Sequence, residues 1–187
     1  MPAARLLVIS GPSGAGKSAV VKRIQELRPQ AALALSATTR PPRPGEKDGV
    51  DYRFVGAAGF DGLLRDGGLL EWAVVHGVHR YGTLQADVRA KLAQGRLVLL
   101  DVDLQGLKSI KKIYPHVISV YLLPPSDREW VRRLESRGIE DADDFQRRLA
   151  TAQAEKREQH LYSLRVVNDD LDRACGEILA LVDDARP

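Results

Sequence analysis

A chain of 187 residues, of which 44% are hydrophobic and 28% charged, has the composition of one folded globular domain and excludes a disordered chain. The formal net charge of +3 is too small to indicate a general nucleic-acid surface. No apolar run is long enough to span a bilayer or to form a signal-peptide core, so we expect a cytoplasmic protein without nucleic-acid or membrane partners.

The first part of the sequence predicts a strand, a glycine-rich turn and a helix. Residues 5–10 (RLLVIS) are a short apolar run, and residues 19–27 repeat apolar positions at helical spacing until Pro29. Similar short apolar runs, separated by helical stretches, return at residues 97–102, 117–123 and 165–167. Strands alternating with helices predict an α/β fold with a central parallel sheet flanked by helices.

Residues 36–91 differ from the rest and predict an inserted small mixed β subdomain. Prolines interrupt this segment early, glycines recur, and short strand candidates follow at residues 52–55 and 70–75. Residues 126–160 are dense in charge with little strand character, which predicts a helical lid.

The closing segment, residues 170–184, has the pattern of an amphipathic helix. Its Cys175 is the single cysteine of the chain, which excludes an internal disulfide, and we expect it to be buried. We therefore divide the single domain 1–187 into a core of residues 4–35, 92–125 and 161–187, a subdomain at 36–91 and a lid at 126–160.

Residues 11–18 read GPSGAGKS, a complete match to the phosphate-binding motif G-x-x-x-x-G-K-[ST] between strand and helix. In such a loop, backbone N–H groups and the positive helix end bind phosphate oxygens. Lys17 can reach the β- and γ-phosphates of ATP, and Ser18 can bind the accompanying Mg²⁺. A glycine-rich turn with a solvated lysine is the alternative, and the full motif disfavours it. The predicted ATP-binding residues are Gly11, Pro12, Ser13, Gly14, Ala15, Gly16, Lys17 and Ser18.

The phosphate loop leaves the acceptor of the phosphoryl group open. Residues 36–52 (SATTRPPRPGEKDGVDY) place Arg40 and Arg43 around a proline pair, so two guanidinium groups on a stiffened loop can fork onto a dianionic phosphate. Tyr52 and Tyr81 can add hydroxyl donors. Taken alone, the loop is better explained as a solvated basic surface, because arginines near prolines are usually surface residues.

Several stretches together resemble the guanylate kinase family, in the same order and at nearly the same spacing. They are SATTRPPRPGEKDGVDYRF from Ser36, GGLLEWAVVHG from Gly67, YGT at 81–83 and LLDVDLQG at 99–106. The resemblance extends to VVND at 166–169 and covers essentially the whole chain. It implies a P-loop nucleoside monophosphate kinase that transfers the γ-phosphoryl group of ATP to GMP, and to dGMP. We expect a monomer or small homo-oligomer.

The resemblance also implies a GMP site. A carboxylate at Glu71 would accept the N1–H and amino protons of guanine and repel the N1 acceptor of adenine. Ser36 and Thr83 would bond O6 and N7, and Asp101 the amino group. The implied GMP-binding residues are Ser36, Arg40, Arg43, Tyr52, Glu71, Tyr81, Thr83 and Asp101.

The catalytic residues implied by the resemblance are the cations Lys17, Arg43, Arg137 and Arg148, which suit the negative charge of a phosphoryl transition state. Arg137 would also contact ATP, with Asn168 and Asp169 near the adenine. Asp101 and Asp103 alternate after the strand 97–100 and so share a face. Either can support Mg²⁺ through water.

One departure and two alternatives remain. Residues 76–83 (HGVHRYGT) are one residue longer than the common family form HGNYYGT, which leaves the register of His76, His79 and Arg80 open. We expect the histidines to be structural or exposed. The alternatives are a kinase for another small phosphorylated acceptor and a non-catalytic guanylate-kinase-like module that binds phosphorylated peptides.

Overall fold

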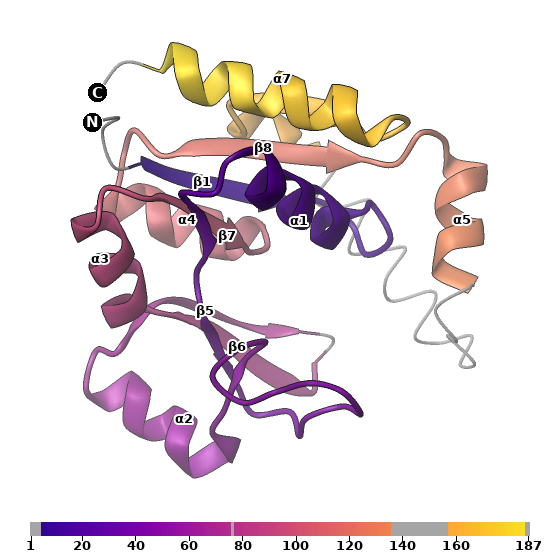
Figure 1. The fold of residues 1–187 in the computed structure, drawn as a ribbon. Helices are drawn as coiled ribbons and strands as arrows, with labels where there is room; N and C mark the ends of the chain where they lie inside the picture. Colours follow the sequence, from indigo (N-terminus) through magenta and orange to yellow (C-terminus); the bar gives the residue numbers. More distant parts are fainter. Residues whose placement is uncertain (1–4, 76, 136–156, 186–187) are drawn as a thin grey trace. The chain divides into compact units, whose positions relative to one another are not determined.

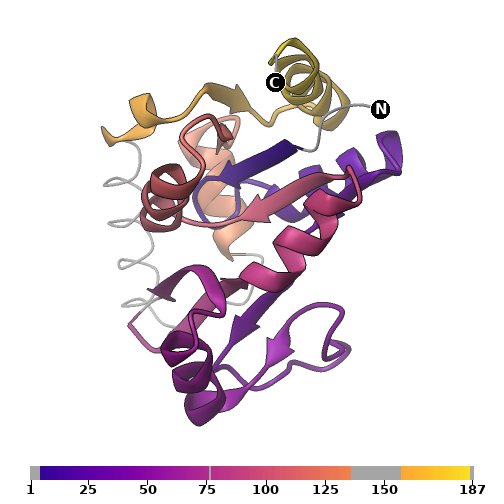
Figure 2. The ribbon, with the colours of Figure 1, turned by 90° about the vertical axis from the view of Figure 1, so that its left-hand side faces the viewer.

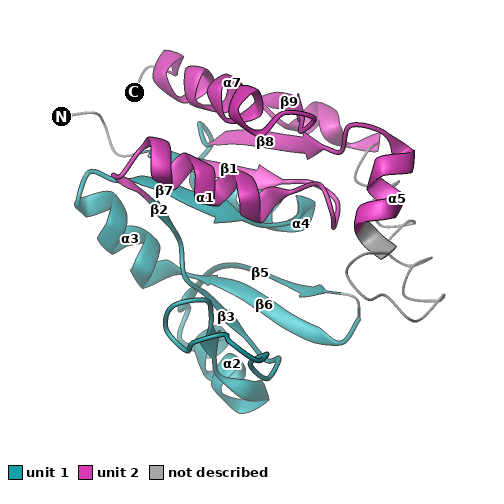
Figure 3. Cartoon of the chain, turned by 45° about the vertical axis from the view of Figure 1, so that its right-hand side comes forward, with its two compact units in different colours: residues 1–6, 32–117 teal, residues 7–31, 118–187 magenta. Residues whose placement is uncertain are grey.

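The computed structural model describes residues 5–75, 77–135 and 157–185. The chain divides into two compact units (Figure 3): unit 1 comprises Met1–Leu6 and Ala32–Val117, and unit 2 comprises Leu7–Ala31 and Ile118–Pro187. Within the described ranges, no helix combines the length and the apolar character needed to cross a membrane.

Unit 2 is built on parallel strands in the spatial order β1 (Arg5–Ser10), β8 (Ile118–Leu123) and β9 (Leu164–Val167). Strands β1 and β8 lie side by side in Figure 1. Its helical elements are α1 (Lys17–Leu27), α5 (Asp127–Glu135), the short 3₁₀ turn η1 (Gln159–Leu161) and α7 (Leu171–Asp184). Nearly every residue of β1 and β8 is buried, as expected of strands covered on both faces. Helix α7 packs against α1 and against the strands β8 and β9.

Helix α7 shows why the sequence pattern forms this element. The Asp170 carboxylate accepts the Arg173 N–H at 2.8 Å and so caps the free donors at the helix start. The helix then buries an apolar face that includes Ile178, Val182 and the fully buried Cys175. The predicted burial of Cys175 is confirmed, and burial raises the pKa of its thiol to about 11.

Unit 1 contains a mixed four-stranded sheet in the order β4 (Arg53–Phe54), β3 (Ser36–Thr38), β6 (His79–Leu84) and β5 (Leu69–Val75). Strand β3 runs parallel to β4, while β6 runs antiparallel to both β3 and β5. The unit also holds the neighbouring strands β2 (Ala31–Leu33) and β7 (Leu97–Asp101), and the helices α2 (Gly56–Arg65), α3 (Gln85–Ala93) and α4 (Leu104–Ile113). Helix α3 lies beside β7 (Figure 2).

The predicted fold class is confirmed, because parallel strands alternate with helices and a mixed sheet lies within residues 36–91. The pairing of β5 with β6 gives the register of His79, which pairs with Val75, and of Arg80, which pairs with Val74, whereas His76 lies outside the described residues. Arg80 then reaches Asp61 of α2 at 2.6 Å. Of the predicted lid, α5 is described, whereas residues 136–156 lie outside the described residues.

Candidate functional site

The phosphate loop, residues 11–18, joins β1 to α1 and requires glycine at two of its positions. Gly11 and Gly16 have φ angles of 146° and 95°, which side-chain-bearing residues rarely adopt. A Cβ atom would lie 2.3 Å from the Leu122 carbonyl oxygen at the first position and 2.3 Å from Asn168 Nδ2 at the second. Both the φ angles and the close contacts with Leu122 and Asn168 therefore require glycine at these two positions.

The loop places a cation and a hydroxyl at the start of α1. Lys17 Nζ donates to the Gly11 carbonyl at 2.8 Å, so its side chain turns back across the loop. Ser18 is exposed in the first helical turn. The N–H groups at a helix start carry partial positive charge, so lysine, loop and helix end together suit a polyphosphate. The Ser18 hydroxyl is a hard oxygen ligand of the kind that Mg²⁺ prefers.

Asn168 and Asp169, predicted near the adenine, have different surroundings. Asn168 is buried, and its side-chain amide donates to the Ala15 carbonyl of the loop at 2.8 Å. Asp169 is exposed and pairs with Arg173, whose hydrogen bond holds the pKa of the carboxyl below its usual range. Asn168 therefore supports the loop directly, whereas Asp169 lies on the surface.

A row of polar side chains crosses the mixed sheet of unit 1. Ser36 on β3 pairs with Thr83 on β6, and Thr83 pairs in turn with Glu71 on β5. Residues directly opposite each other in an antiparallel ladder point to the same face. The structure thus brings together three of the four residues predicted to contact the purine base; the fourth, Asp101, is not part of this row.

Glu71 is the buried centre of this row, with only 7% of its surface exposed. Its Oε1 accepts the backbone N–H of Thr83 at 3.0 Å and the Thr83 hydroxyl at 2.5 Å. Its Oε2 makes no hydrogen bond with any described residue and lies against α4, where a Cβ atom on Gly106 would come within 2.8 Å. Burial raises the pKa of the Glu71 carboxyl, and the charge of Asp103 adds to this shift. The row therefore offers one carboxylate oxygen to a ligand donor.

Arg40 is held beside the row by several partners. Its guanidinium donates to both carboxylate oxygens of Glu46 at 2.8 Å, to the Pro41 carbonyl at 2.7 Å and to the Tyr81 hydroxyl at 3.1 Å. Glu46 also accepts the backbone N–H of Arg43 at 2.7 Å. The Arg40 guanidinium and this N–H lower the pKa of the Glu46 carboxyl to about 2. Glu46 is therefore ionised and joins both predicted phosphate-binding arginines.

A guanidinium carries five N–H donors, and the contacts above engage four of those of Arg40. One Nη2 donor remains for a ligand. Arg43, in contrast, is exposed on the same loop. The Tyr52 ring lies 5.4 Å from Arg40 Cζ and 5.8 Å from the Tyr81 ring, and burial raises the pKa of its phenol. Tyr52 therefore stays protonated and able to donate.

Asp101 and Asp103 differ in their local partners. The Asp103 carboxylate caps α4 by accepting the Gly106 N–H at 2.8 Å. Asp101 is exposed at the end of β7, and its charge contributes to the raised pKa of Tyr52. Helix capping thus occupies Asp103, while Asp101 lies near the tyrosine of the predicted phosphate site.

Comparison with known proteins decides the family. The guanylate kinase family model matches residues 3–185. The chain belongs to the guanylate kinase family. It is 49% identical over 179 residues to a guanylate kinase of Mycolicibacterium paratuberculosis (95% of this chain, 80% of the relative) and 48% identical over 178 residues to one of Thermobifida fusca (95% and 90%). The crystal structure of guanylate kinase from Anaplasma phagocytophilum is similar, with a TM-score of 0.79 and 28% identity, covering 98% of this chain and 86% of that one.

Membership of the guanylate kinase family confirms the predicted resemblance. The predicted catalytic residues Arg137 and Arg148 lie outside the described residues.

Two residues of the candidate site were missed by sequence reasoning. Glu46 follows Arg43 by three positions across a glycine turn, a spacing that could have identified it as a counter-ion. Gly106 gave no such signal, because its importance depends on the approach of α4 to β5.

Glu46→Gln should raise the KM for GMP about tenfold and leave the KM for ATP within a factor of about two, because the amide cannot hold the Arg40 fork through two charge-assisted hydrogen bonds. Steady-state kinetics with each substrate varied in turn would measure this. Asp61→Asn, which alters an exposed carboxylate paired with Arg80, is the matched control in the same unit. A lower KM for GMP in Glu46→Gln would instead mean that Glu46 competes with the substrate phosphate.

Proposed function

We propose that this member of the guanylate kinase family transfers the γ-phosphoryl group of ATP to GMP, giving ADP and GDP, and that it also accepts dGMP. The observation that carries this proposal is the buried carboxylate of Glu71, aligned with Ser36 and Thr83. Guanine presents adjacent N1–H and amino donors to such a carboxylate, whereas adenine presents an acceptor that the carboxylate repels.

Thr83 limits how the base can bind. Its hydroxyl has one proton, which it donates to Glu71, so in this arrangement it meets guanine only as an acceptor. To donate to O6 or N7, as the resemblance implies, the hydroxyl must rotate away from Glu71. That rotation would free Oε1 as a second acceptor for the guanine donors while the Thr83 N–H continues to hold the carboxylate.

The donor nucleotide is proposed to bind on the phosphate loop, with backbone N–H groups around the phosphates and Lys17 at the β- and γ-phosphates. Ser18 is the proposed Mg²⁺ ligand, with Asp101 or Asp103 able to act through water. Bound Mg²⁺ supplies neutralising charge at the β- and γ-phosphate oxygens. Asn168 contributes by holding the Ala15 carbonyl, and Asp169 is the more exposed candidate near the adenine.

In the proposed reaction an oxygen of the GMP phosphate bonds to the γ-phosphorus while the bond to the bridging oxygen of ATP breaks, and ADP leaves. The attacking oxygen is already anionic, so no general base is required. Arg40, Arg43, Tyr52 and Tyr81 hold the acceptor phosphate. The proposed lid, residues 126–160, adds the catalytic cations Arg137 and Arg148, and cations are what the spreading transition-state charge requires. The proposal places this reaction in the cytoplasm.

A coupled assay of ADP release with a panel of nucleoside monophosphates tests the proposal. GMP should support turnover at least about a hundredfold faster than AMP or dTMP at equal subsaturating concentration, since a wrong base leaves a buried carboxylate unpaired. Comparable turnover of AMP or dTMP would favour a kinase for another acceptor. No GMP-dependent ADP release at all would favour the non-catalytic module.

The affinity for GMP should fall as the pH falls, because protonation of Glu71 removes the acceptor that the guanine donors need. Burial raises the pKa of this carboxyl above its ordinary value of 4.5, so the loss begins at a higher pH than for an exposed glutamate. GMP itself titrates near pH 6, so Glu71→Gln serves as the reference. The ratio of wild-type to variant affinity should decrease from about pH 8 to about pH 5. A constant ratio would contradict ionised Glu71 as the guanine acceptor.

A further inference from the structure

The first turns of α5 carry a buried tryptophan that contacts the phosphate loop. Trp130 is 7% exposed, and its indole N–H donates to the carbonyl of Ser13 at 2.7 Å, although 117 positions separate the two residues in sequence. A buried indole N–H needs an acceptor, and here the acceptor is the backbone of the loop. The other tryptophan, Trp72, lies in unit 1 and is 45% exposed.

The Ser13 carbonyl and the Gly14 N–H belong to one planar peptide unit, so a contact with the first also orients the second. In a planar trans peptide the carbonyl and the following N–H point in opposite directions, and no described peptide bond is cis. An indole that holds the Ser13 carbonyl on one side therefore turns the Gly14 N–H to the other. Asn168 acts in the same way on the Ala15 carbonyl and so orients the Gly16 N–H.

The peptide units of the loop need these hydrogen bonds because they adjoin glycines, whose backbone is flexible. Gly14 and Gly16 have φ angles of 85° and 95°, and glycine crosses between conformations more readily than other residues. A run of N–H groups that converge on one point binds an anion, whereas a flipped peptide would present a carbonyl oxygen to it. The hydrogen bonds to Ser13 and Ala15 therefore bias two peptide units of the loop toward the anion-binding orientation.

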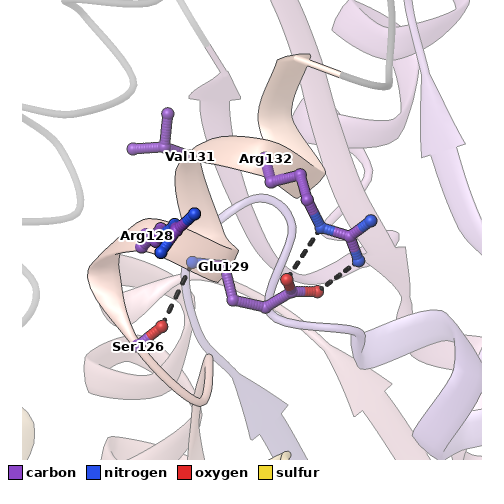
Figure 4. Close-up of a pocket in the computed structure, with 5 residues that line it drawn as sticks. All are labelled: Ser126, Arg128, Glu129, Val131 and Arg132. Carbon is purple, nitrogen blue, oxygen red and sulfur yellow. Dashed lines mark hydrogen bonds and ion pairs between the residues drawn. The ribbon is translucent and has the colours of Figure 1, made fainter.

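Hydrogen bonds and ion pairs among the polar side chains of α5 hold the helical turn that carries Trp130. Figure 4 shows the Ser126 hydroxyl accepting the Glu129 N–H at 3.1 Å and the Glu129 carboxylate bound to Arg132 through two contacts of 2.8 Å. Arg133 also donates to Glu129 at 2.9 Å, and these arginines lower the pKa of the Glu129 carboxyl to about 2. A capped and cross-linked helix start presents the indole in a defined position.

We propose that Trp130 is a positioning residue for the donor nucleotide, acting through the Ser13 carbonyl to keep the Gly14 N–H directed toward the phosphates. This inference rests on the proposed binding of ATP to the loop. It assigns Trp130 no contact with the nucleotide. Its effect is therefore on the affinity for ATP and not on that for the acceptor.

Trp130→Phe tests the proposal because phenylalanine keeps an aromatic ring and lacks the N–H. The dissociation constant and the KM for ATP should rise about fivefold, the value of one ordinary hydrogen bond, while the KM for GMP stays within a factor of about two. Trp72→Phe is the matched control in unit 1 and should leave the constants for ATP unchanged. A purely structural role would lower the melting temperature without separating the two KM values.

A second measurement avoids altering the contact. In the Trp72→Phe protein, Trp130 is the single tryptophan, and its emission should change saturably with ATP and not with GMP alone. No ATP-dependent change, or a folded Trp130→Phe protein with the wild-type dissociation constant for ATP, would overturn the proposal. The proposed function fails separately, if the wild-type chain binds ATP yet releases no ADP when GMP is added.

Discussion

Replacing Glu71 by glutamine is expected to reduce kcat/KM for GMP by roughly two orders of magnitude, which lies within the about 2–4 kcal/mol expected for a buried charge-assisted contact. The side chain keeps its size, but its second position becomes an N–H₂ group that opposes the N1–H and amino donors of guanine. The same group can donate to N1 of adenine. The ratio of kcat/KM for GMP to that for AMP should therefore fall even further than the value for GMP alone.

Steady-state kinetics with both monophosphates would measure this change of preference. Glu177→Gln is a matched control, because Glu177 is an exposed carboxylate on α7 that pairs with Arg173. It should leave both constants unchanged. If Glu71→Gln retained the wild-type kcat/KM for GMP, Glu71 would have no place in the base site and the proposed selectivity would be wrong.

The same substitution should stabilise the empty protein at neutral pH. The folded chain binds the Glu71 proton more tightly than the unfolded chain, because burial raises the pKa of this carboxyl. The contribution of Glu71 to the free energy of unfolding therefore falls as the pH rises from the unfolded-state pKa to the folded-state pKa, and it stays lower at every pH above that interval. Glutamine does not titrate, so the variant does not lose this free energy. A functional carboxylate kept at the expense of stability is expected at a ligand site.

Local sequence was sufficient to identify the phosphate loop, because its glycines, lysine and helix start are adjacent in the chain, whereas its contacts with Leu122, Trp130 and Asn168 are long-range and were not predicted. The three residues of the polar row in unit 1 were predicted from motifs, but the geometry of this row depends on the register of three strands. Ser36, Thr83 and Glu71 share a face because β6 pairs with both β3 and β5. No periodicity in so short a strand as Ser36–Thr38 specifies that pairing.

Helices α2 and α3 were not predicted within residues 36–91. Helix α2 reads GAAGFDGLLR, and its glycines lower the intrinsic helix propensity, so tertiary packing decides the outcome. Phe60 of this helix is fully buried and lies edge-on to Trp72 at a centroid distance of 6.3 Å. Trp130 was missed for a related reason: its neighbours DREWVRR are charged, and only long-range contact identifies the tryptophan as a buried residue.

Lys17→Met is expected to lower kcat by at least about a thousandfold, because it removes the cation that we propose meets the developing charge on the β- and γ-phosphates. The affinity for GMP, measured without ATP, should stay within a factor of about two, since the proposed base and phosphate contacts of the acceptor belong to unit 1 and Lys17 to unit 2. Methionine keeps the length of the side chain.

Two further substitutions test whether the effect depends on the position of the lysine in α1 and on the shape of its cation. Lys22→Met, on an exposed residue of the same helix α1, should leave kcat unchanged. Lys17→Arg should restore little of the activity, because a planar guanidinium cannot take the place of a compact ammonium that also reaches the Gly11 carbonyl. A Lys17→Met protein with near wild-type kcat would remove the lysine from the transfer step. Loss of GMP binding in that variant would instead mean that the two substrate sites depend on each other, contrary to a lysine that serves the donor alone.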